Sequence, residues 1–250
     1  MAYDLKDEVV VIAGGAGLIG KALSKAFAEE GAKVVIASKE GKGFAQEIGA
    51  GFHELDISDE SSVDRLIKDM DKGHGKIDVF INCAWPKTDD WMTNVEEVKF
   101  KSILKNLEMH LGGYWLCCQR FALYMKKQGH GRIINFSSTQ GVVAPNFSVY
   151  EGTKMTSPPA YPLIKGGIIM MTKYFATYFA KHNVRVNSVS PGGVYNDQDP
   201  DFVKRYSKLT PLGRMAKAEE IVSPVLMLAS KKSSYMTGEN IMVDGGWTTW

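Results

Sequence analysis

The feature that most constrains this fold is an apolar run followed directly by a cluster of glycines and then by a helical pattern. The apolar run is Val9-Val10-Val11-Ile12, the glycine cluster spans residues 13–20, and residues 21–30 carry the helical pattern. Glycines let a backbone turn tightly and approach an anion, and the next helix offers unpaired N–H groups to a phosphate. This order predicts a dinucleotide site, whose cofactor contacts in the turn are expected at Gly14, Gly17, Leu18, Ile19 and Gly20.

Strand-like and helix-like segments continue to alternate along the chain, which is the pattern of a doubly wound parallel sheet. With 250 residues and no internal repeat or break in composition, we expect one α/β domain over residues 1–250. The prediction is a single Rossmann-type doubly wound parallel β-sheet of about seven strands flanked by helices, with its ligand at the carboxyl ends of the strands. The further strands are expected at 33–37, 51–55, 77–81, 132–136, 185–190 and 240–244, and the further helices at about 59–70, 95–127, 161–182 and 218–229.

Two segments do not fit this alternation. Residues 139–160 read as an insertion that wraps the substrate pocket, and residues 195–213 read as a flap that contains a short helix.

Charge and cysteine content narrow the partners and the compartment. Thirty basic and 28 acidic residues give a net charge of +2 without any block of like charges, so we expect no nucleic-acid and no membrane partner. The three cysteines are odd in number and lack the spacing of metal ligands, which favours reduced thiols and no metal. The first residues are charged and lead into a strand, and no apolar run could span a bilayer, so we expect a cytoplasmic protein with a small-molecule substrate.

Two copies of Tyr-x-x-x-Lys suggest proton-transfer chemistry, at Tyr150 with Lys154 and at Tyr161 with Lys165. A tyrosine and a lysine four residues apart share one helix face, and a nearby ammonium lowers the phenol pKa from its usual value of about 10. The serine hydroxyl of Ser138, which follows the strand at 132–136, could hold the same substrate oxygen. The spacing alone does not choose between the two copies.

The second strand ends at Ser38-Lys39, where an acidic residue would be expected for a free ribose 2′-hydroxyl. Ser38 and Lys39 could instead bind a 2′-phosphate, which favours NADP(H). Alternatively, Lys39 is a solvated loop residue and Glu40 turns inward to the ribose, which leaves NAD(H) possible.

Over almost its whole length the chain resembles the short-chain dehydrogenase/reductase (SDR) family. The matching marks are the glycine turn at 14–20, Asp56, Asn82-Cys83-Ala84, Ser138, Tyr161 with Lys165, Pro191-Gly192 and the ending at 237–246. The resemblance implies that Tyr161 and Lys165 form the catalytic pair, because Lys165 precedes the Pro-Gly turn by one helix and one strand. It also implies cofactor contacts at Asp56, Ile57, Asn82, Ala84, Tyr161, Lys165, Pro191, Gly193 and Val194.

The chain departs from the family pattern in four ways. Leu18 replaces the middle glycine of the usual turn, and about ten additional residues separate Ser138 from Tyr161; both features resemble extended members that act on nucleotide sugars. His110 stands where the family has an asparagine that anchors a water of the proton relay, and it could carry protons itself or be a packed helix residue. Trp85 replaces a glycine, either as a pocket wall or as a cover of the sheet edge.

The resemblance therefore implies an enzyme, an NADP-preferring dehydrogenase/reductase that moves a hydride between its cofactor and a carbonyl or secondary alcohol of a sugar or sugar derivative. The insertion and the glycine turn also resemble the oxidoreductases of bacterial flagellin sugar modification. The alternatives are a nucleotide-sugar epimerase or dehydratase with internal hydride return, and a catalytically weak NADP-binding sensor. Family members associate through their two long helices and their last strand, so a homo-tetramer or dimer is expected, with the aromatic residues 247–250 at an interface or beside a neighbour's pocket.

Overall fold

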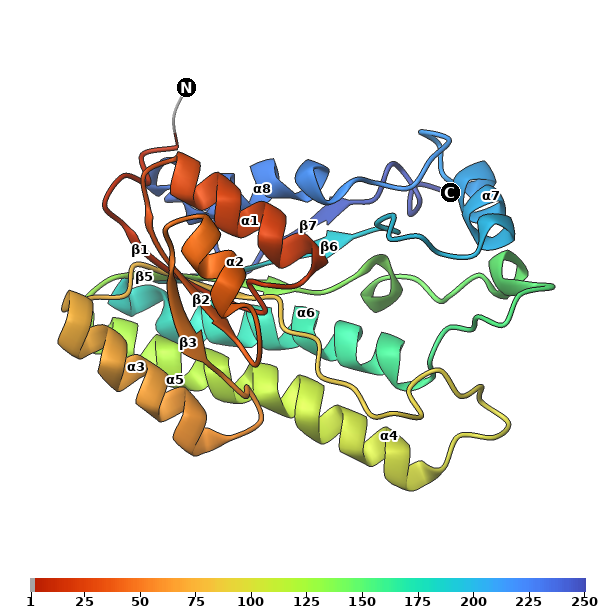
Figure 1. Cartoon of the computed structure of the whole chain (residues 1–250), viewed down its shortest axis with the longest axis horizontal. Coiled ribbons are helices and arrows are strands. Elements are labelled where there is room, and N and C mark those ends of the chain that lie inside the picture. Colours follow the sequence, from red (N-terminus) through yellow and green to blue (C-terminus); the bar gives the residue numbers. More distant parts are fainter. Residues whose placement is uncertain (1–2) are drawn as a thin grey trace.

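The computed structural model describes residues 3–250, and only residues 1 and 2 of the expected domain lie outside it (Figure 1). Seven parallel strands form one sheet in the order β3-β2-β1-β4-β5-β6-β7, which confirms the doubly wound Rossmann-type fold. The strand order reverses between β1 and β4. A crevice opens beyond the carboxyl ends of the strands at such a point, and ligands of this fold bind there.

The strands agree closely with the predicted ones, although β4 begins two residues later than expected. The central strands are buried on both faces, which explains their nearly continuous apolar sequence. The strand bounds are β1 Val9–Ala13, β2 Lys33–Ser38, β3 Gly51–Glu54, β4 Val79–Asn82, β5 Gly131–Phe136, β6 Val184–Pro191 and β7 Asn240–Val243.

Helices cover both faces of the sheet (Figure 1). The hydrophobic core on one face is closed by α3, α5 and α6, and the core on the other face is closed by α1 and α8. The helix bounds are α1 Leu18–Glu29, α2 Lys42–Glu47, α3 Glu60–His74, α4 Phe100–Asn106, α5 Gly113–Gln128, α6 Ala160–Phe179, α7 Pro200–Leu209 and α8 Val222–Ala229.

Two helices show how local sequence sets their bounds. Asp59 caps α3 by accepting a hydrogen bond from the backbone N–H of Ser61. The short helix α2 was not predicted, because six residues behind a glycine carry too few periodic positions. The helix predicted over residues 95–127 contains a π-helical turn, Leu107–Gly112, which joins α4 to α5.

A small third core joins the insertion to the flap. Val149 of the insertion packs with Phe202 and Tyr206 of α7 and with Met215, and Trp247 from the C-terminal segment packs against them. The flap therefore packs against the insertion at the carboxyl ends of the strands. Of the helices described here, none is both long and apolar enough to cross a membrane.

Candidate active site

The glycine-rich turn lies against the end of β4. Gly14 has a left-handed backbone (φ 76°), and a Cβ atom there would lie 2.7 Å from the Cα of Ala84. A Cβ on Gly20 would lie 2.1 Å from the carbonyl oxygen of Gly14, so the first turn of α1 packs directly on the loop. Gly17 is the N-cap of α1, and its neighbour Leu18 is partly exposed at the helix N-terminus. This arrangement fits a dinucleotide pyrophosphate.

A cleft of about 340 Å³ extends from this turn along the ends of β2, β3 and β4. Six residues that the sequence analysis assigned to the cofactor line it: Gly14, Ser38, Lys39, Asp56, Ile57 and Ala84. The structure therefore brings together the predicted adenosine-side residues, and their shape and polarity fit the adenosine half of a dinucleotide.

The charged residues of this cleft are Lys39, Asp56 and Lys87. The ammonium of Lys39 lies 2.6 Å from a carboxylate oxygen of Asp56. Burial raises the pKa of Asp56, but the hydrogen bonds from Lys39 and Ser58 outweigh burial and lower the pKa to about 2. Asp56 is thus ionised throughout the neutral range, and Lys39 is paired with it although the Lys39 side chain is 66 % exposed.

The catalytic residues predicted at the carboxyl ends of the strands meet around one phenol. Ser138 follows β5, and Tyr161 and Lys165 lie in the first turns of α6. The Ser138 side chain lies close enough to the Tyr161 hydroxyl to affect its pKa. The Lys165 ammonium lies 5.5 Å from the centre of the Tyr161 ring and donates a hydrogen bond of 2.9 Å to the carbonyl oxygen of Phe136.

One expectation about this group is wrong for the structure as it stands. Burial raises the pKa of Tyr161 to about 12, where the sequence argument expected Lys165 to lower it. Lys165 is itself buried, which lowers its pKa to about 7, and its ammonium is directed to a backbone carbonyl. In this arrangement Tyr161 is a proton donor, and a lower pKa requires the ammonium to approach the phenol oxygen.

Two tryptophans provide much of this burial. The Trp85 ring is stacked on the Tyr161 ring with 5.6 Å between centroids and 16° between planes. Trp91 meets the same ring edge-on at 6.1 Å. Trp85 is 56 % exposed and also lines the cofactor cleft, so it is a pocket wall rather than a cover of the sheet edge.

His110 lies in the buried layer between the sheet and the helices. It is fully buried beside the Tyr114 ring, and within residues 3–250 neither of its ring nitrogens has a hydrogen-bond partner. Burial and the Lys165 charge lower its pKa well below the usual value, so the imidazole is neutral. Asn82 at the end of β4 is also fully buried, and its side-chain oxygen and nitrogen equally lack partners among the described atoms.

The end of β6 lies on the flap side of the site. Pro191 ends the strand, and Val194 forms a bridge with Ala216. The backbone N–H of Gly193 donates a hydrogen bond of 2.6 Å to the Tyr206 hydroxyl of α7. A hydrogen bond thereby joins the flap to the turn that is expected to contact the cofactor.

Sequence reasoning missed Trp91, Gln140 and Tyr206 as residues of this region. It also set Tyr150 aside as the non-catalytic copy of the motif, yet Tyr150 lies close enough that a charge on it would raise the pKa of Tyr161. A second tyrosine near the catalytic serine in sequence was the one available signal.

Comparison with known proteins agrees with this geometry. A family model described as enoyl-(acyl carrier protein) reductase matches residues 14–248. Post-translational flagellin modification protein A of Campylobacter coli is 33% identical, covering 97% of this chain and 99% of that protein. Sorbose reductase of Candida albicans is 31% identical, covering 98% and 89%. A short-chain dehydrogenase from Leptospira borgpetersenii, solved with bound NAD+, superposes with a TM-score of 0.89 at 32% identity, covering 97% and 93%.

Fold and site together define a nucleotide-dependent oxidoreductase. The chain belongs to the short-chain dehydrogenase/reductase family and is an NAD(P)-dependent enzyme.

Proposed function

We propose that this enzyme interconverts a ketone or aldehyde and the corresponding alcohol on a sugar or sugar derivative, with NADP(H) preferred over NAD(H). The proposal rests mainly on the meeting of three side chains: Ser138 lies beside the Tyr161 hydroxyl, and Lys165, one helical turn away, has its ammonium 5.5 Å from the Tyr161 ring centre. The sorbose reductase and the flagellin modification protein among the relatives support a sugar substrate.

Each residue of the site has a separate role in this reaction. The bound cofactor supplies the hydride in reduction and accepts it in oxidation. Ser138 donates a hydrogen bond to the reacting oxygen, and Tyr161 gives that oxygen its proton in reduction or takes it in oxidation. Lys165 then restores the proton of Tyr161 when its ammonium turns from the Phe136 carbonyl toward the phenol. A positioned general acid of this kind contributes about 10²- to 10⁴-fold to the rate.

His110 continues the proton path in this proposal. A neutral imidazole can accept a proton on one nitrogen and release one from the other, so it passes protons without acquiring a lasting charge. The ring nitrogens of His110 have no partner among the described residues, and His110 lies close enough to Lys165 for its charge to lower the His110 pKa. Buried polar groups without a protein partner bind ordered water. The family's asparagine would thus be replaced by a residue that relays protons itself.

Cofactor preference is proposed from the end of β2. A 2′-phosphate would compete with Asp56 for Lys39 and would accept a hydrogen bond from Ser38, and both residues line the cleft. The contribution from Lys39 must exceed what is lost when its ion pair with Asp56 separates, and this pair is partly exposed and therefore weak.

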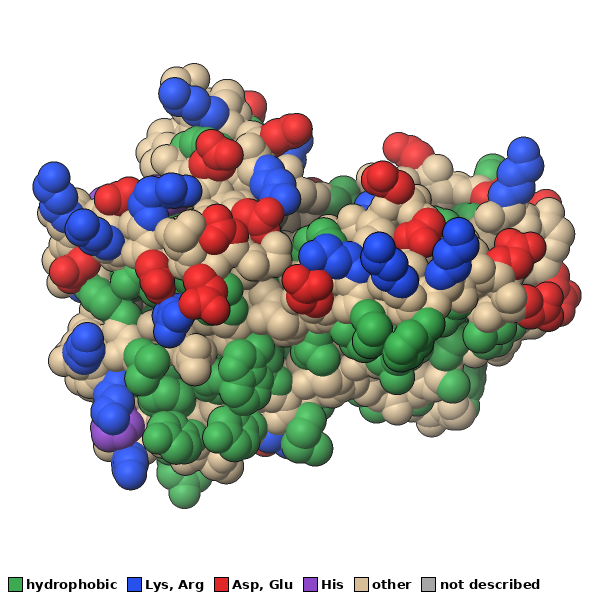
Figure 2. Space-filling model, turned by 90° about the horizontal axis from the view of Figure 1, so that it is seen from below, with side chains coloured by type: hydrophobic (Ala, Val, Ile, Leu, Met, Phe, Trp, Pro, Cys, Tyr) green, Lys and Arg blue, Asp and Glu red, His purple; other side chains and the backbone are tan. Residues whose placement is uncertain are grey.

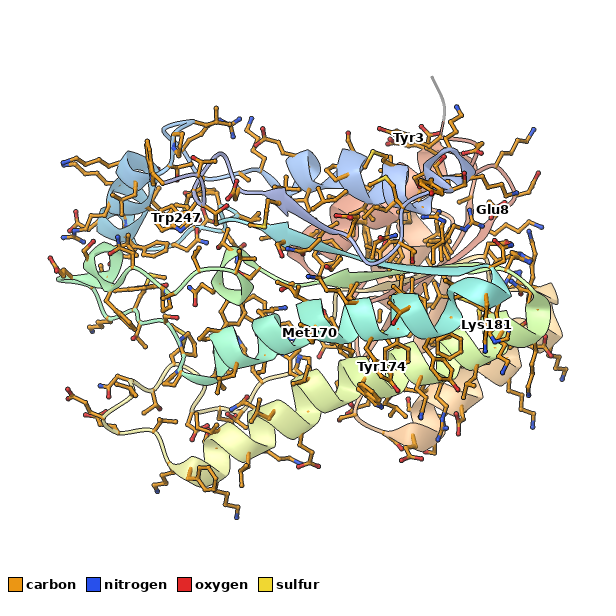
Figure 3. All side chains as sticks on the ribbon, turned by 180° about the vertical axis from the view of Figure 1, so that it is seen from behind. Tyr3, Glu8, Met170, Tyr174, Lys181 and Trp247 are labelled. Carbon is orange, nitrogen blue, oxygen red and sulfur yellow. The ribbon has the colours of Figure 1, made fainter. Side chains whose placement is uncertain are left out.

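We also propose that the enzyme is a dimer or tetramer in the cytoplasm. Figure 2 shows hydrophobic side chains gathered on one side of the surface. The exposed aromatic and apolar residues of α5 and α6 include Trp115, Met170, Tyr174 and Tyr178. Figure 3 shows Met170 and Tyr174 along α6. Light scattering would show a mass of two or four chains, and a single chain would contradict this part of the proposal.

The nucleotide-sugar alternative is less well supported. A second cleft of about 600 Å³ lies between residues 89–97 and 153–156, and its charged residues are Asp89, Asp90, Glu97 and Lys154. If the substrate extended into this cleft, three carboxylates against one ammonium would repel a sugar-linked diphosphate and would accept an uncharged, hydroxyl-bearing compound more readily.

The proposal is tested by titrating NADPH and NADH separately into the protein while nicotinamide fluorescence is followed, and then by adding sugar ketones to each complex. We expect tighter binding of NADPH and oxidation of the cofactor by at least one sugar ketone. Tighter binding of NADH would overturn the cofactor preference. Binding without oxidation by any ketone or aldehyde would overturn the reductase.

A further inference from the structure

Three side chains beside Ser138 form a network of hydrogen bonds. The hydroxyl of Ser157 donates to the amide oxygen of Gln140 at 2.6 Å, and the amide nitrogen of Gln140 donates to the Tyr150 hydroxyl at 3.4 Å. Ser157 therefore fixes the orientation of the Gln140 amide, with its nitrogen directed toward Tyr150.

This network is hydrogen-bonded to Ser138. The backbone N–H of Gln140 donates to the Ser138 oxygen at 3.2 Å. The Tyr150 hydroxyl also lies close enough to Tyr161 for charge on one to affect the other. A substrate carbonyl held by Ser138 and Tyr161 would therefore lie next to the side chains of Gln140 and Tyr150.

Two polar groups of this network can form hydrogen bonds beyond those made to the described residues. A primary amide has two N–H donors, and the Gln140 amide makes one hydrogen bond to Tyr150. The Tyr150 oxygen can accept a second hydrogen bond beyond the one from Gln140. Gln140 and Tyr150 are both half-buried, so part of each side chain is open to solvent or to a substrate.

We propose that Gln140 and Tyr150, oriented by Ser157, bind a hydroxyl group that the substrate carries close to its carbonyl, and so select polyhydroxylated carbonyl compounds over simple ketones. This inference rests on the proposed function and identifies the residues that give it specificity. An alcohol is both donor and acceptor, which matches the free N–H of Gln140 and the free lone pair of Tyr150.

Tyr150 also packs against the flap. Its ring is stacked on Phe202 of the flap helix α7, with 5.3 Å between centroids and 29° between planes. This contact with the flap helix fixes the position of the Tyr150 ring. Changing Tyr150 to Phe removes the hydroxyl and keeps this packing.

The test compares six-carbon substrates that differ in hydroxyls, namely a 2-ketohexose and 2-hexanone, in the Tyr150→Phe and Gln140→Met variants. We expect kcat/KM for the ketohexose to fall about tenfold to a hundredfold, mainly through KM, while kcat/KM for 2-hexanone changes less than threefold. Matched controls are Tyr235→Phe and Gln46→Met, which alter exposed side chains away from the site and should leave both values unchanged. Equal losses on both substrates, or no loss on either, would overturn the proposal.

A binding measurement separates this proposal from the reductase itself. Calorimetric titration of hexitol into the cofactor-loaded protein needs no turnover, and we expect both site variants to weaken hexitol binding at least tenfold. Variant-sensitive binding without turnover of any ketone would support the hydroxyl site and refute the reductase. Turnover of 2-hexanone with hexitol binding that the variants do not change would support the reductase and refute the hydroxyl site.

Discussion

Trp85 shields the phenol ring of Tyr161 from water, and removing the Trp85 side chain should lower the pKa of Tyr161. The Trp85 ring covers one face of the Tyr161 ring, and burial is the largest cause of the rise in the Tyr161 pKa to about 12. Burial penalises the phenolate, so re-admitting water must shift the pKa downward toward the usual value of about 10. Trp85→Ala is suitable because the side chain is more than half exposed and its loss opens no sealed core.

The size of the effect is bounded by the structure. The full rise from 10 to about 12 corresponds to about 2.7 kcal/mol of penalty on the phenolate. Trp85 shares the cover of the ring with Trp91, so its removal should recover about half of this, or about one pH unit.

Phenolate absorbance near 295 nm in the ligand-free protein measures the shift. Subtracting the titration of the matching Tyr161→Phe protein isolates Tyr161 from the other tyrosines. We expect its midpoint to be about one pH unit lower in Trp85→Ala than in the wild type, and unchanged in Tyr235→Ala, which removes an exposed aromatic ring elsewhere. An unchanged or higher midpoint in Trp85→Ala would refute the account of the site's electrostatics.

Three further predictions concern the cofactor site and stability. Lys165→Met should raise the free energy of unfolding near pH 6 by about 2 kcal/mol, because the wild-type fold buries an ammonium that the unfolded chain exposes. Since the folded pKa is lowered to about 7, this gain should shrink as pH rises from 7 toward 10.5, and a gain that grows with pH in urea titrations would contradict it. Gly14→Ala should weaken binding of both cofactors at least tenfold and destabilise the fold by about 2 kcal/mol, since its Cβ would overlap the backbone of Ala84; near-wild-type fluorescence titrations and melting would contradict this. Lys39→Ala should weaken NADPH binding about tenfold while NADH binding changes less than threefold, and equal losses would show that Lys39 does not read the 2′-phosphate.

Much of the fold could be predicted because the buried strands have a strong local signal. The apolar runs at β1, β2, β5 and β6 need both faces covered, and their alternation with helical patterns leads to a parallel sheet. The short helix α2 was missed because its six residues carry almost no pattern.

The site was harder to predict because its decisive contacts join distant segments. The spacing of Tyr161 and Lys165 suggested the proton chemistry, but only the family pattern separated this pair from Tyr150 and Lys154. The stacking of Trp85 on Tyr161 depends on how a loop after β4 meets the start of α6, and no local sequence rule contains it. For the same reason the expected effect of Lys165 on Tyr161 was wrong for this structure, since burial and the Phe136 carbonyl outweigh proximity along one helix.

The central claim is hydride transfer assisted by Tyr161, and deuterium transfer tests it most directly. The enzyme is supplied with NADPH deuterated at the transferred position and a ketohexose, and the alcohol product is analysed by mass spectrometry. We predict one deuterium in each product molecule for the wild type, and a rate at least a hundredfold lower for Tyr161→Phe with cofactor affinity within threefold of the wild type. An alcohol without deuterium, or a Tyr161→Phe enzyme as fast as the wild type, would contradict the account.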